Sequence, residues 1–271
     1  MYKLTEEEKE RYSRQLLLDE IGVEGQCRIH DGRVLVVGAG GLGSPILLYL
    51  AAAGVGTIGI VDGDVVDRTN LQRQVIHRTA DLGRAKVISA AEKMRAINPN
   101  INVIEHQEFM TATNALQLID DYDFIIDATD NFAVKFLIND ACILANKPFS
   151  HGGILRLDGQ TFTHLPGTTC FRCLFKEPPP TDFVPPVAGV LGSAVGVIGT
   201  IQATEALKYL GQWGQLLTNQ LLTFNAPSMT FRKVNIKPDP KCAICSPQPT
   251  ITSLKDYDLP LKVKNMLKQN D

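Results

Sequence analysis

The feature that most restricts the fold of this chain is a glycine-rich turn at 38–43, with the sequence Gly-Ala-Gly-Gly-Leu-Gly. It follows 33–37, a short β-branched run typical of a buried strand, and it precedes 44–53, a predicted helix. Glycines at such a turn let the backbone approach a phosphate closely at a helix N-terminus. The pattern predicts nucleotide binding, and the alternative is a tight turn that only packs strand against helix. The motif glycines are Gly38, Gly40, Gly41 and Gly43.

An acidic residue follows the turn at the distance expected for ribose binding. Asp62 comes directly after the next predicted strand, 57–61, about 20 residues beyond the turn. A carboxylate at this place accepts hydrogen bonds from ribose hydroxyls. The turn and Asp62 together do not choose between NAD, FAD and ATP, so an NAD-dependent oxidoreductase is an open alternative.

The rest of the N-terminal half alternates strands with helices. Such a β-α-β-α order predicts an α/β fold, a Rossmann-like doubly wound sheet that is mostly parallel, with helices on both faces. Further strands are expected at 102–106, 124–126 and 148–150, and further helices at 86–97, 112–120 and 131–145.

The C-terminal half changes character and predicts antiparallel strands added to the same sheet. We expect a hairpin with its turn at Asp158-Gly159. A Pro-rich segment at 178–186 and a glycine-spaced helix ending near 211 follow it, and then two strands at 220–224 and 229–235. The predicted organisation is an N-terminal helical arm (1–30), a nucleotide-binding domain (31–249) and a short tail (250–271). The arm should begin with one helix, from a capping box of Thr5 and Glu8 to about Leu18.

Composition narrows the class of protein. Of the 271 residues, 44% are hydrophobic and 21% charged, and the net charge is −2. This balance is typical of a globular protein and provides no basic surface for nucleic acid or membrane lipid. The N-terminus lacks the apolar core of a signal peptide, and the most apolar stretch, 187–206, is interrupted by glycines. We therefore expect a cytoplasmic protein without nucleic-acid or membrane partners.

Two cations and a second acid favour ATP over a dinucleotide. Arg73 and Lys86 follow the ribose-binding acid, and such cations neutralise triphosphate oxygens and a pyrophosphate leaving group. Asp130 follows the strand at 124–126, so it should lie at the carboxyl edge of the sheet and could hold Mg²⁺. Taken singly, Arg73 and Lys86 could instead be solvated surface cations, and Asp130-Asn131 a helix N-cap.

The cysteines predict a zinc site. Cys170 and Cys173 form one Cys-x-x-Cys pair, and Cys242 and Cys245 form another. Four thiolates in two close pairs are typical of a closed structural Zn²⁺ centre, although unligated thiols or a redox pair are the alternatives. The remaining two, Cys27 and Cys142, are expected to be buried structural residues. These are predictions of structure and not of catalysis.

Several motifs in order resemble the adenylyltransferases related to ubiquitin-activating enzymes. That family includes the molybdopterin-synthase adenylyltransferase and the thiazole-pathway sulfur-carrier adenylyltransferase. The resemblance runs from about Arg11 to Cys245 and includes both cysteine pairs. The other motifs are Arg-Tyr-Ser-Arg-Gln at 11–15, the glycine turn at 38–43, Ala-Gly-Val-Gly at 53–56, Asn-Leu-Gln-Arg-Gln at 70–74 and Asp-Ala-Thr-Asp-Asn at 127–131.

The resemblance implies that 31–249 is an ATP-binding adenylation domain with a zinc site, and it implies a reaction and a role for each matching residue. ATP and Mg²⁺ would activate the C-terminal glycine carboxylate of a ubiquitin-like sulfur carrier ending in Gly-Gly, which needs no general base because it is already ionised. Arg14 would reach into the ATP site of a partner subunit, which implies a homodimer. The other implied contacts are Gly41 with phosphate, Asp62 with ribose, Asn70, Arg73 and Lys86 with the triphosphate, and Asp130 with magnesium, with Asn131 beside it; Thr69, Leu71 and Gln72 belong to the same nucleotide-binding segment.

One departure from the family concerns sulfur transfer. Many relatives carry a cysteine in the loop before the Ala-Gly-Val segment, whereas 183–190 of this chain has none. We therefore expect release or retention of the acyl-adenylate, with sulfur supplied by a separate sulfurtransferase or cysteine desulfurase. The hairpin at 154–160 is closer to the molybdopterin type, so that carrier is favoured over the thiazole carrier. A relative that keeps the fold but has lost the chemistry is a further alternative.

Overall fold

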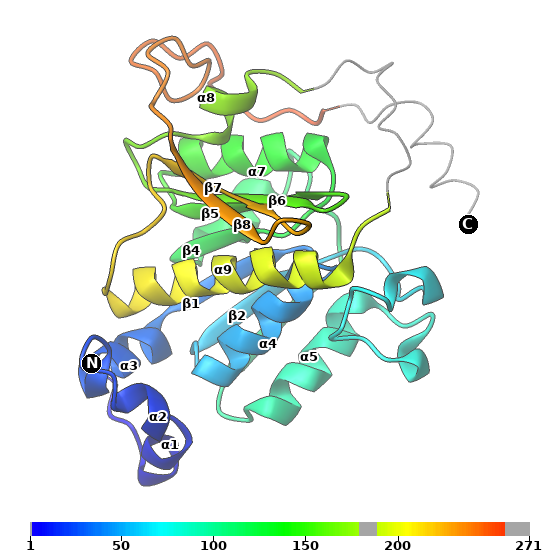
Figure 1. Ribbon diagram of the computed structural model, residues 1–271, viewed down its shortest axis with the longest axis vertical. Coiled ribbons are helices and arrows are strands. Elements are labelled where there is room, and N and C mark those ends of the chain that lie inside the picture. The colour runs from blue at the N-terminus through cyan, green and yellow to red at the C-terminus, as the bar shows by residue number, and fades with distance from the viewer. Residues whose placement is uncertain (1, 179–188, 258–271) are drawn as a thin grey trace.

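The computed structural model describes residues 2–178 and 189–257, which contain one eight-stranded sheet (Figure 1). The strand order is β3-β2-β1-β4-β5-β6-β7-β8, and helices cover both faces. The strands are β1 (Arg33–Val37), β2 (Thr57–Val61), β3 (Asn102–His106), β4 (Phe124–Asp127), β5 (Phe149–Leu155), β6 (Asp158–His164), β7 (Gln220–Asn225) and β8 (Thr230–Asn235). The α-helices are α1 (Glu6–Arg11), α2 (Ser13–Leu16), α3 (Gly22–Asp31), α4 (Gly43–Ala53), α5 (Lys86–Ile97), α6 (Ala115–Asp120), α7 (Phe132–Leu144), α8 (Phe171–Phe175) and α9 (Gly192–Gly211).

The parallel half of the sheet has β1 near its centre. β1 pairs in parallel with β2 on one side and with β4 on the other, so Val37 lies level with Val61 and Asp127. Because the chain leaves all three strands at the same edge, the loops after β1, β2 and β4 must meet there. This topology confirms the predicted doubly wound sheet, and the parallel pairing continues to β3 and β5.

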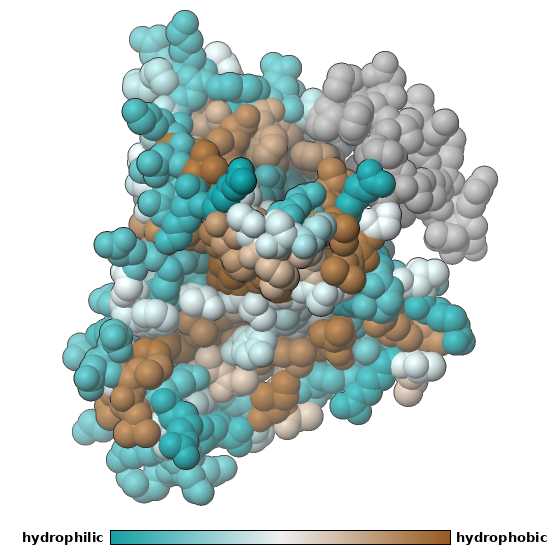
Figure 2. Space-filling view, viewed as in Figure 1, coloured by the Kyte–Doolittle hydropathy of each residue, from teal (hydrophilic) through white to brown (hydrophobic). Residues whose placement is uncertain are grey.

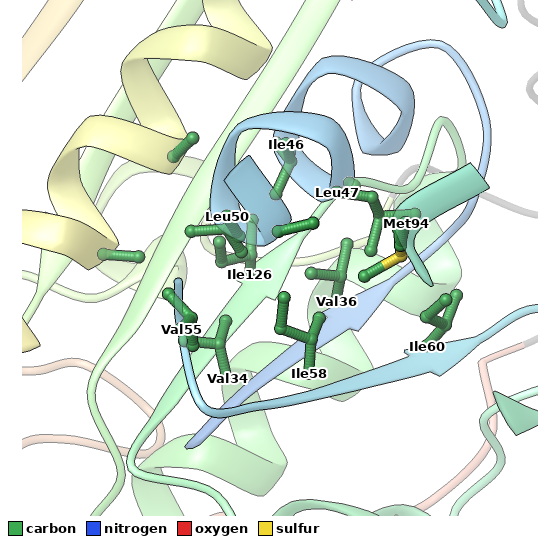
Figure 3. Close-up of a cluster of buried hydrophobic side chains, with 14 of the residues drawn as sticks. Val34, Val36, Ile46, Leu47, Leu50, Val55, Ile58, Ile60, Met94 and Ile126 are labelled. Carbon is green, nitrogen blue, oxygen red and sulfur yellow. The ribbon is translucent and has the colours of Figure 1, made fainter. Parts of the chain in front are cut away.

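Two hydrophobic cores hold the helices on the sheet. Side chains alternate along a strand, so Val34 and Val36 of β1 face α4, while Leu35 and Val37 face the opposite core. Figure 3 shows Ile46 and other side chains of α4 packed against the first face. All four β1 side chains are nearly inaccessible to solvent. The strand is buried on both faces, which explains its unbroken run of Val and Leu.

The antiparallel half confirms the predicted extension but corrects the hairpin. β5 continues without interruption to Leu155, pairs antiparallel with β6, and turns at Arg156-Leu157 rather than at Asp158-Gly159. Arg156 takes the left-handed conformation of this tight turn, with φ 59°. The Asp-Gly pair predicted a turn, but the cross-strand register places it inside β6. The Pro-rich segment lies mostly outside the described residues, as do 258–271.

The N-terminal helix is the second correction. The capping box of Thr5 and Glu8 is present, but the helix ends at Arg11 and α2 begins at Ser13. Tyr12 interrupts the helix because its side chain is buried and its hydroxyl accepts a hydrogen bond from the amide nitrogen of Asn98 at 2.8 Å. Tertiary burial therefore overrides helix continuity at this position.

Two helices, α3 and α8, were not anticipated from the sequence. α3 contains two glycines, yet Arg28 fixes it to the end of α9 by two hydrogen bonds to the carbonyl of Gly211, at 2.8 and 3.0 Å. α8 is only five residues long; it follows Cys170 directly and contains Cys173. α9 begins at Gly192, and no helix in the described part of the chain has the length and apolar character to cross a membrane.

Candidate functional site

The glycine-rich turn closes tightly against the loop that follows β4. Gly38 has φ +101°, and a Cβ atom there would lie 2.9 Å from the carbonyl oxygen of Ala128. At Gly43 a Cβ would lie only 2.0 Å from the carbonyl oxygen of Gly38. No larger side chain fits either place without moving backbone, so these two glycines have a steric reason. The turn leads directly into α4, whose N-terminal amides are suited to bind phosphate.

Asp62 is held at the turn by its own hydrogen bonds. Its Oδ2 accepts the backbone N–H of Ala39 at 2.8 Å, and its Oδ1 accepts the backbone N–H of Asp64 at 2.9 Å. The side chain is partly exposed. A carboxylate fixed in this way beside the turn is placed to accept a hydrogen bond from a ribose hydroxyl.

Lys86 begins α5 and is brought to the same edge of the sheet. Its Nζ donates to Asp64 Oδ2 at 2.9 Å, and its backbone N–H donates to the carbonyl of Asp64 at 3.0 Å. Lys86 is buried, whereas the Asp64 side chain is half exposed. Asp64 therefore holds the Lys86 ammonium at the edge of the site. Because Asp64 is half exposed, an incoming phosphate could replace it as the partner of Lys86.

Arg73 lies directly over the turn. A Cβ added to Gly41 would lie 3.4 Å from Arg73 Cγ, so the two residues are neighbours. The Arg73 guanidinium donates to the carbonyl of Thr69 at 3.2 Å. Thr69 is fixed in turn by Asp67, whose Oδ1 accepts both its backbone N–H and its hydroxyl.

The other residues of this segment lie around Arg73. Asn70 and Leu71 are partly exposed and Gln72 is exposed. A Cβ added to Gly192 at the start of α9 would lie 2.5 Å from the carbonyl oxygen of Gln72. The segment 69–73 is thus packed between the glycine turn and α9. It brings Arg73 to the edge of the sheet where β1, β2 and β4 end, which we call the nucleotide edge after its predicted ligand.

Asp130 and Asn131 lie on the loop between β4 and α7. The start of this loop is tied to the turn because Ala128 donates its N–H to the carbonyl of Val37 at 3.0 Å. Asn131 caps α7 by accepting the backbone N–H of Val134 at 3.0 Å. Asp130 is exposed between these two fixed points. The sequence alternative of an N-cap is therefore correct for Asn131, and Asp130 is left at the edge with the turn.

Arg14 lies elsewhere in this chain. Its neighbour Gln15 donates to the carbonyl of Ala53 at 3.3 Å, which places α2 at the C-terminal end of α4. The 11 residues of α4 rise about 16 Å from the glycine turn to that end. Figure 1 shows α1 and α2 away from the strand ends where the turn lies. Arg14 is exposed and is not brought to the nucleotide edge of its own chain.

A buried ionic group under the site was not anticipated. Asp127 ends β4 and accepts from Lys135 Nζ at 3.1 and 3.2 Å and from His151 Nδ1 at 2.9 Å. Burial acts to raise the pKa of Asp127, but the charge of Lys135 and the His151 hydrogen bond outweigh it and lower the pKa to about 2. His151 is itself 1% exposed, so it belongs to the buried group and does not line an open crevice.

The sequence carried one signal for this group. Lys135 is the only charged residue among the first eight residues of α7, Phe132 to Asn139. A single cation in a mostly apolar helical stretch with no other charge needs a buried partner. The partner could have been sought at the end of the preceding strand, where Asp127 stands.

His77 is a second residue that sequence reasoning did not assign. Its Nε2 lies 2.9 Å from the carbonyl oxygen of Ala39 in the glycine turn, and its Nδ1 lies 2.9 Å from Ser89 Oγ. A carbonyl only accepts, so Nε2 carries the proton and Nδ1 accepts from the serine. Burial lowers the pKa of His77, so the ring is neutral when it supports the turn.

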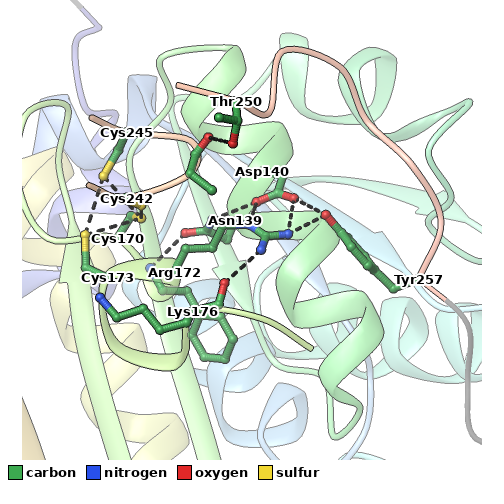
Figure 4. Close-up of polar contacts among 12 residues, drawn as sticks. Asn139, Asp140, Cys170, Arg172, Cys173, Lys176, Cys242, Cys245, Thr250 and Tyr257 are labelled. Atoms are coloured by element: carbon green, nitrogen blue, oxygen red, sulfur yellow. Dashed lines mark hydrogen bonds and ion pairs between the residues drawn. The ribbon is translucent and has the colours of Figure 1, made fainter. Parts of the chain in front are cut away.

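The four paired cysteines form one cluster (Figure 4). Their sulfur atoms all lie within 4.8 Å of one another. Sulfur–sulfur separations are 3.7 Å from Cys170 to Cys173 and Cys242, and 3.5 Å from Cys245 to Cys170 and Cys173. A tetrahedral Zn²⁺ with bonds of about 2.3 Å requires separations of about 3.8 Å, so the donor set fits this ion.

The two other cysteines are buried, as expected. Cys27 is 4% exposed and packs with Leu4 and Tyr12, and Cys142 lies in the core between α7 and the sheet. Burial raises the pKa of Cys142 well above its ordinary value. Its thiol is protonated and inert at neutral pH, which agrees with a structural role.

The motifs and the nucleotide edge match a known family. The sequence matches the ThiF family over residues 12–244. The chain belongs to the ThiF family.

Similar proteins of known name cover most of this ThiF-family chain. A sulfur carrier protein adenylyltransferase of Thermus thermophilus is 44% identical over 262 residues, which cover 94% of this chain and 97% of that protein. An adenylyltransferase and sulfurtransferase MOCS3 of Anopheles gambiae is 46% identical over 260 residues, and a probable adenylyltransferase/sulfurtransferase MoeZ of Mycobacterium tuberculosis is 47% identical over 262. The chain spans 59% and 65% of the lengths of these two.

Solved structures support the ThiF-family fold. The crystal structure of E. coli MccB with ATP has a TM-score of 0.77 and 24% sequence identity, covering 87% of this chain and 74% of that one. The crystal structure of PaaA has a TM-score of 0.75 and 25% identity, covering 88% and 77%. At this level of identity, MccB shows likeness of fold alone.

Proposed function

We propose that this chain is a nucleotidyltransferase that uses ATP and Mg²⁺ to adenylate the C-terminal carboxylate of a ubiquitin-like sulfur carrier ending in Gly-Gly. The observation that carries the proposal is the meeting of the glycine turn, Asp62, Arg73, Lys86 and the Asp130 loop at one edge of the sheet. The similarity to a protein named sulfur carrier protein adenylyltransferase, and to one named adenylyltransferase and sulfurtransferase, supports it.

The chemistry follows from the side chains at that edge. The amides after the turn and the side chains of Arg73 and Lys86 bind the triphosphate and offset charge on the leaving pyrophosphate. Asp62 orients the ribose, and Asp130 has the oxygen donors that Mg²⁺ prefers. The carrier carboxylate attacks the α-phosphorus, the bond to the β-phosphate oxygen breaks, and pyrophosphate leaves. Catalysis in this scheme is mainly positioning and charge neutralisation.

We propose that the working form is a homodimer in which Arg14 completes the site of the partner subunit. The distance between Arg14 and the nucleotide edge of its own chain supports this arrangement, because Arg14 cannot reach that site and could take part in the reaction only in a partner subunit. Exposed apolar residues on the α2 and α4 side, including Leu17 and Tyr49, supply surface that a dimer would cover. Figure 2 shows apolar patches on the face that carries α9 and α4.

We propose the molybdopterin-synthase small subunit as the carrier, with the thiazole carrier as the second candidate. MOCS3 and MoeZ, the relatives with sulfurtransferase in their names, are both longer than this chain. The segment 183–190 contains no cysteine. A separate sulfurtransferase or cysteine desulfurase would then deliver sulfur to the adenylated carrier, in the cytoplasm. The cysteine cluster, with structural Zn²⁺, would supply rigidity rather than chemistry.

The test is ATP–pyrophosphate exchange with a ubiquitin-like carrier ending in Gly-Gly. Exchange that needs Mg²⁺ and an intact carrier terminus supports the proposal, whereas a carrier lacking its final glycine is the control. NADH binding without exchange would instead favour an oxidoreductase. Binding of ATP with no exchange for either carrier would favour a relative without catalytic activity.

A further inference from the structure

The loop that carries Asp130 rests on a buried ion pair. Lys135 and Asp127 are 7% and 2% exposed, and their charged atoms meet at 3.1 Å. Lys135 Nζ also donates to the carbonyl of Gly152 at 2.6 Å, so the ammonium links α7, β4 and β5. β4 ends and α7 begins at the nucleotide edge, and Gly152 of β5 lies one residue beyond the level of Asp127.

The carboxylate of Asp127 is occupied from several sides. Its Oδ1 accepts the hydroxyl and the backbone N–H of Thr129 at 2.7 and 3.1 Å, and its Oδ2 accepts from His151. A carboxylate only accepts, so His151 donates through Nδ1. Burial, and next the charge of Lys135, lower the pKa of His151, so the imidazole is neutral at pH 7 and Lys135 carries the compensating charge.

These contacts determine where the loop lies. Thr129 is fixed to Asp127 on one side of Asp130, and Asn131 is fixed by its cap on the other. Ala128, between Asp127 and Thr129, lies against Gly38 of the turn. The ion pair therefore sets the position of the loop relative to the turn through backbone contacts, without reaching the nucleotide itself.

A purely stabilising role explains this group poorly. Replacing a buried ion pair with apolar residues of similar size is often neutral or stabilising, so its presence is weak evidence of a stability requirement. Its place under the Asp130 loop provides a different reason. We propose that Lys135, acting through Asp127, is a positioning residue that holds Asp130 in register with the glycine turn; this inference rests on the proposed function.

The test compares variants that keep or remove the pair. The single change Lys135→Met leaves the charge of Asp127 buried without a partner, and this variant can fail to fold. The main variant is therefore Asp127→Asn/Lys135→Met, called the neutral pair because it removes both charges. Lys135→Arg keeps the positive charge. Asp140→Asn/Arg172→Met is the matched control, because this pair between α7 and α8 is equally buried and lies beside the cysteine cluster.

The expected result is a loss in kcat rather than in ATP affinity. In pyrophosphate exchange the neutral pair should lower kcat roughly 100-fold, the scale of an ångström misplacement, with KM for ATP changed much less. Lys135→Arg should recover most of the loss, and the control variant should keep kcat within about twofold. Equal losses in the neutral pair and the control would overturn the proposal.

Two further measurements separate positioning from other roles. In an Asp130→Ala background, where only residual pyrophosphate exchange is measured at high enzyme concentration, Asp127→Asn/Lys135→Met should lower that residual rate by no more than about twofold, because the group to be positioned is gone. Full additivity would overturn the inference. Amide hydrogen exchange of the peptide over 128–134 should be faster in Asp127→Asn/Lys135→Met than in wild type, without a matching increase in β1. An unchanged rate of hydrogen exchange would also overturn the inference. The hydrogen-exchange measurement does not depend on enzyme activity. A wild-type protein that lacks ATP–pyrophosphate exchange would therefore count against the proposed function alone.

Discussion

At the residue scale, the nucleotide edge is made of side chains whose own partners hold them in place. Asp62 is fixed by two backbone N–H groups, and Lys86 by Asp64. Preorganised side chains lose little conformational freedom when a ligand binds, so ordering them subtracts little from the binding free energy. A substitution of such a residue changes both the stability of the chain and its binding of the ligand, so the two effects must be measured separately.

Gly43→Ala should disrupt the turn. The new Cβ would meet the carbonyl oxygen of Gly38 at 2.0 Å, so backbone must move, at a cost of about 1–3 kcal/mol in unfolding free energy and a loss of ATP binding. Gly196→Ala is the matched control, because that glycine lies in α9 with no atom within 4 Å of its added Cβ. The control should raise stability by about 0.5–1 kcal/mol. Urea unfolding and ATP titration measure both effects, and a neutral Gly43→Ala would contradict the steric argument.

His77 predicts a pH dependence of stability. Its pKa is lowered by burial, so between that value and the ordinary 6.5 the unfolded chain takes up a proton that the folded chain does not. Stability from this group is therefore full above pH 6.5 and falls as the pH drops below it, by up to about 1.4 kcal/mol per unit.

The comparison with His77→Gln isolates that term. Glutamine can still donate to the carbonyl of Ala39 but does not titrate. Urea unfolding of both proteins at pH 7.5 and 5.5 should show a smaller loss on acidification for the variant, and other titrating groups cancel in the difference. An identical loss in both would mean that His77 does not contribute.

At the element scale, the parallel half of the fold could be predicted and the details of the other half could not. Local chemistry marks β1 by its β-branched run and the end of α4 by Gly54, which takes the left-handed conformation with φ 81°. The bounds of β1 and α4 match the predicted ranges within a residue. Tyr12 and the Asp158-Gly159 pair were misread because burial against Asn98 and cross-strand register decide those positions. Such long-range terms do not appear in a local pattern.

The same limit applies to the candidate site. The nucleotide edge was predictable because strand ends in a doubly wound sheet meet at one edge. Lys135 was not assigned, because only the folded structure brings it to Asp127 and to the carbonyl of Gly152. Residues that touch a ligand leave motifs in the sequence, whereas those that support them leave only a residue of unexpected polarity.

The end of α9 supplies a prediction at this scale. Gln212 terminates the helix in the left-handed region, with φ 58°, where a side chain costs about 1–2 kcal/mol and glycine costs little. Gln212→Gly should therefore stabilise the chain by about 1 kcal/mol in thermal or urea unfolding. Gln215→Gly, an exposed position in the same loop without a positive φ, is the control and should lower stability slightly. Destabilisation by Gln212→Gly would contradict this account of the helix end.

At the scale of the whole molecule, the cysteine cluster joins distant parts of the chain. It ties the segment before the Pro-rich region to residues after β8, so a bound ion would close a long loop. Chelation or Cys242→Ser should lower the free energy of unfolding by about 2–4 kcal/mol, the scale of a long-loop cross-link. Zinc content and urea unfolding measure this, with Cys27→Ala as a variant that keeps the metal. Unchanged stability after the metal is removed would argue against a structural centre.

The proposed dimer makes a prediction that no single chain can satisfy. If Arg14 of one subunit completes the site of the other, Arg14→Ala and Lys86→Ala chains are each inactive, but a mixed dimer contains one site with both residues intact. Random mixing makes half of the dimers mixed, so pyrophosphate exchange should return to roughly a quarter of wild type. A mixture of Lys86→Ala with Asp130→Ala is the control, because both changes lie on the same side of the site. In that mixture each site still lacks one of the two residues, so activity should not return. Recovery in the control, or none in the first mixture after subunit exchange is verified, would mean that Arg14 does not act across the interface.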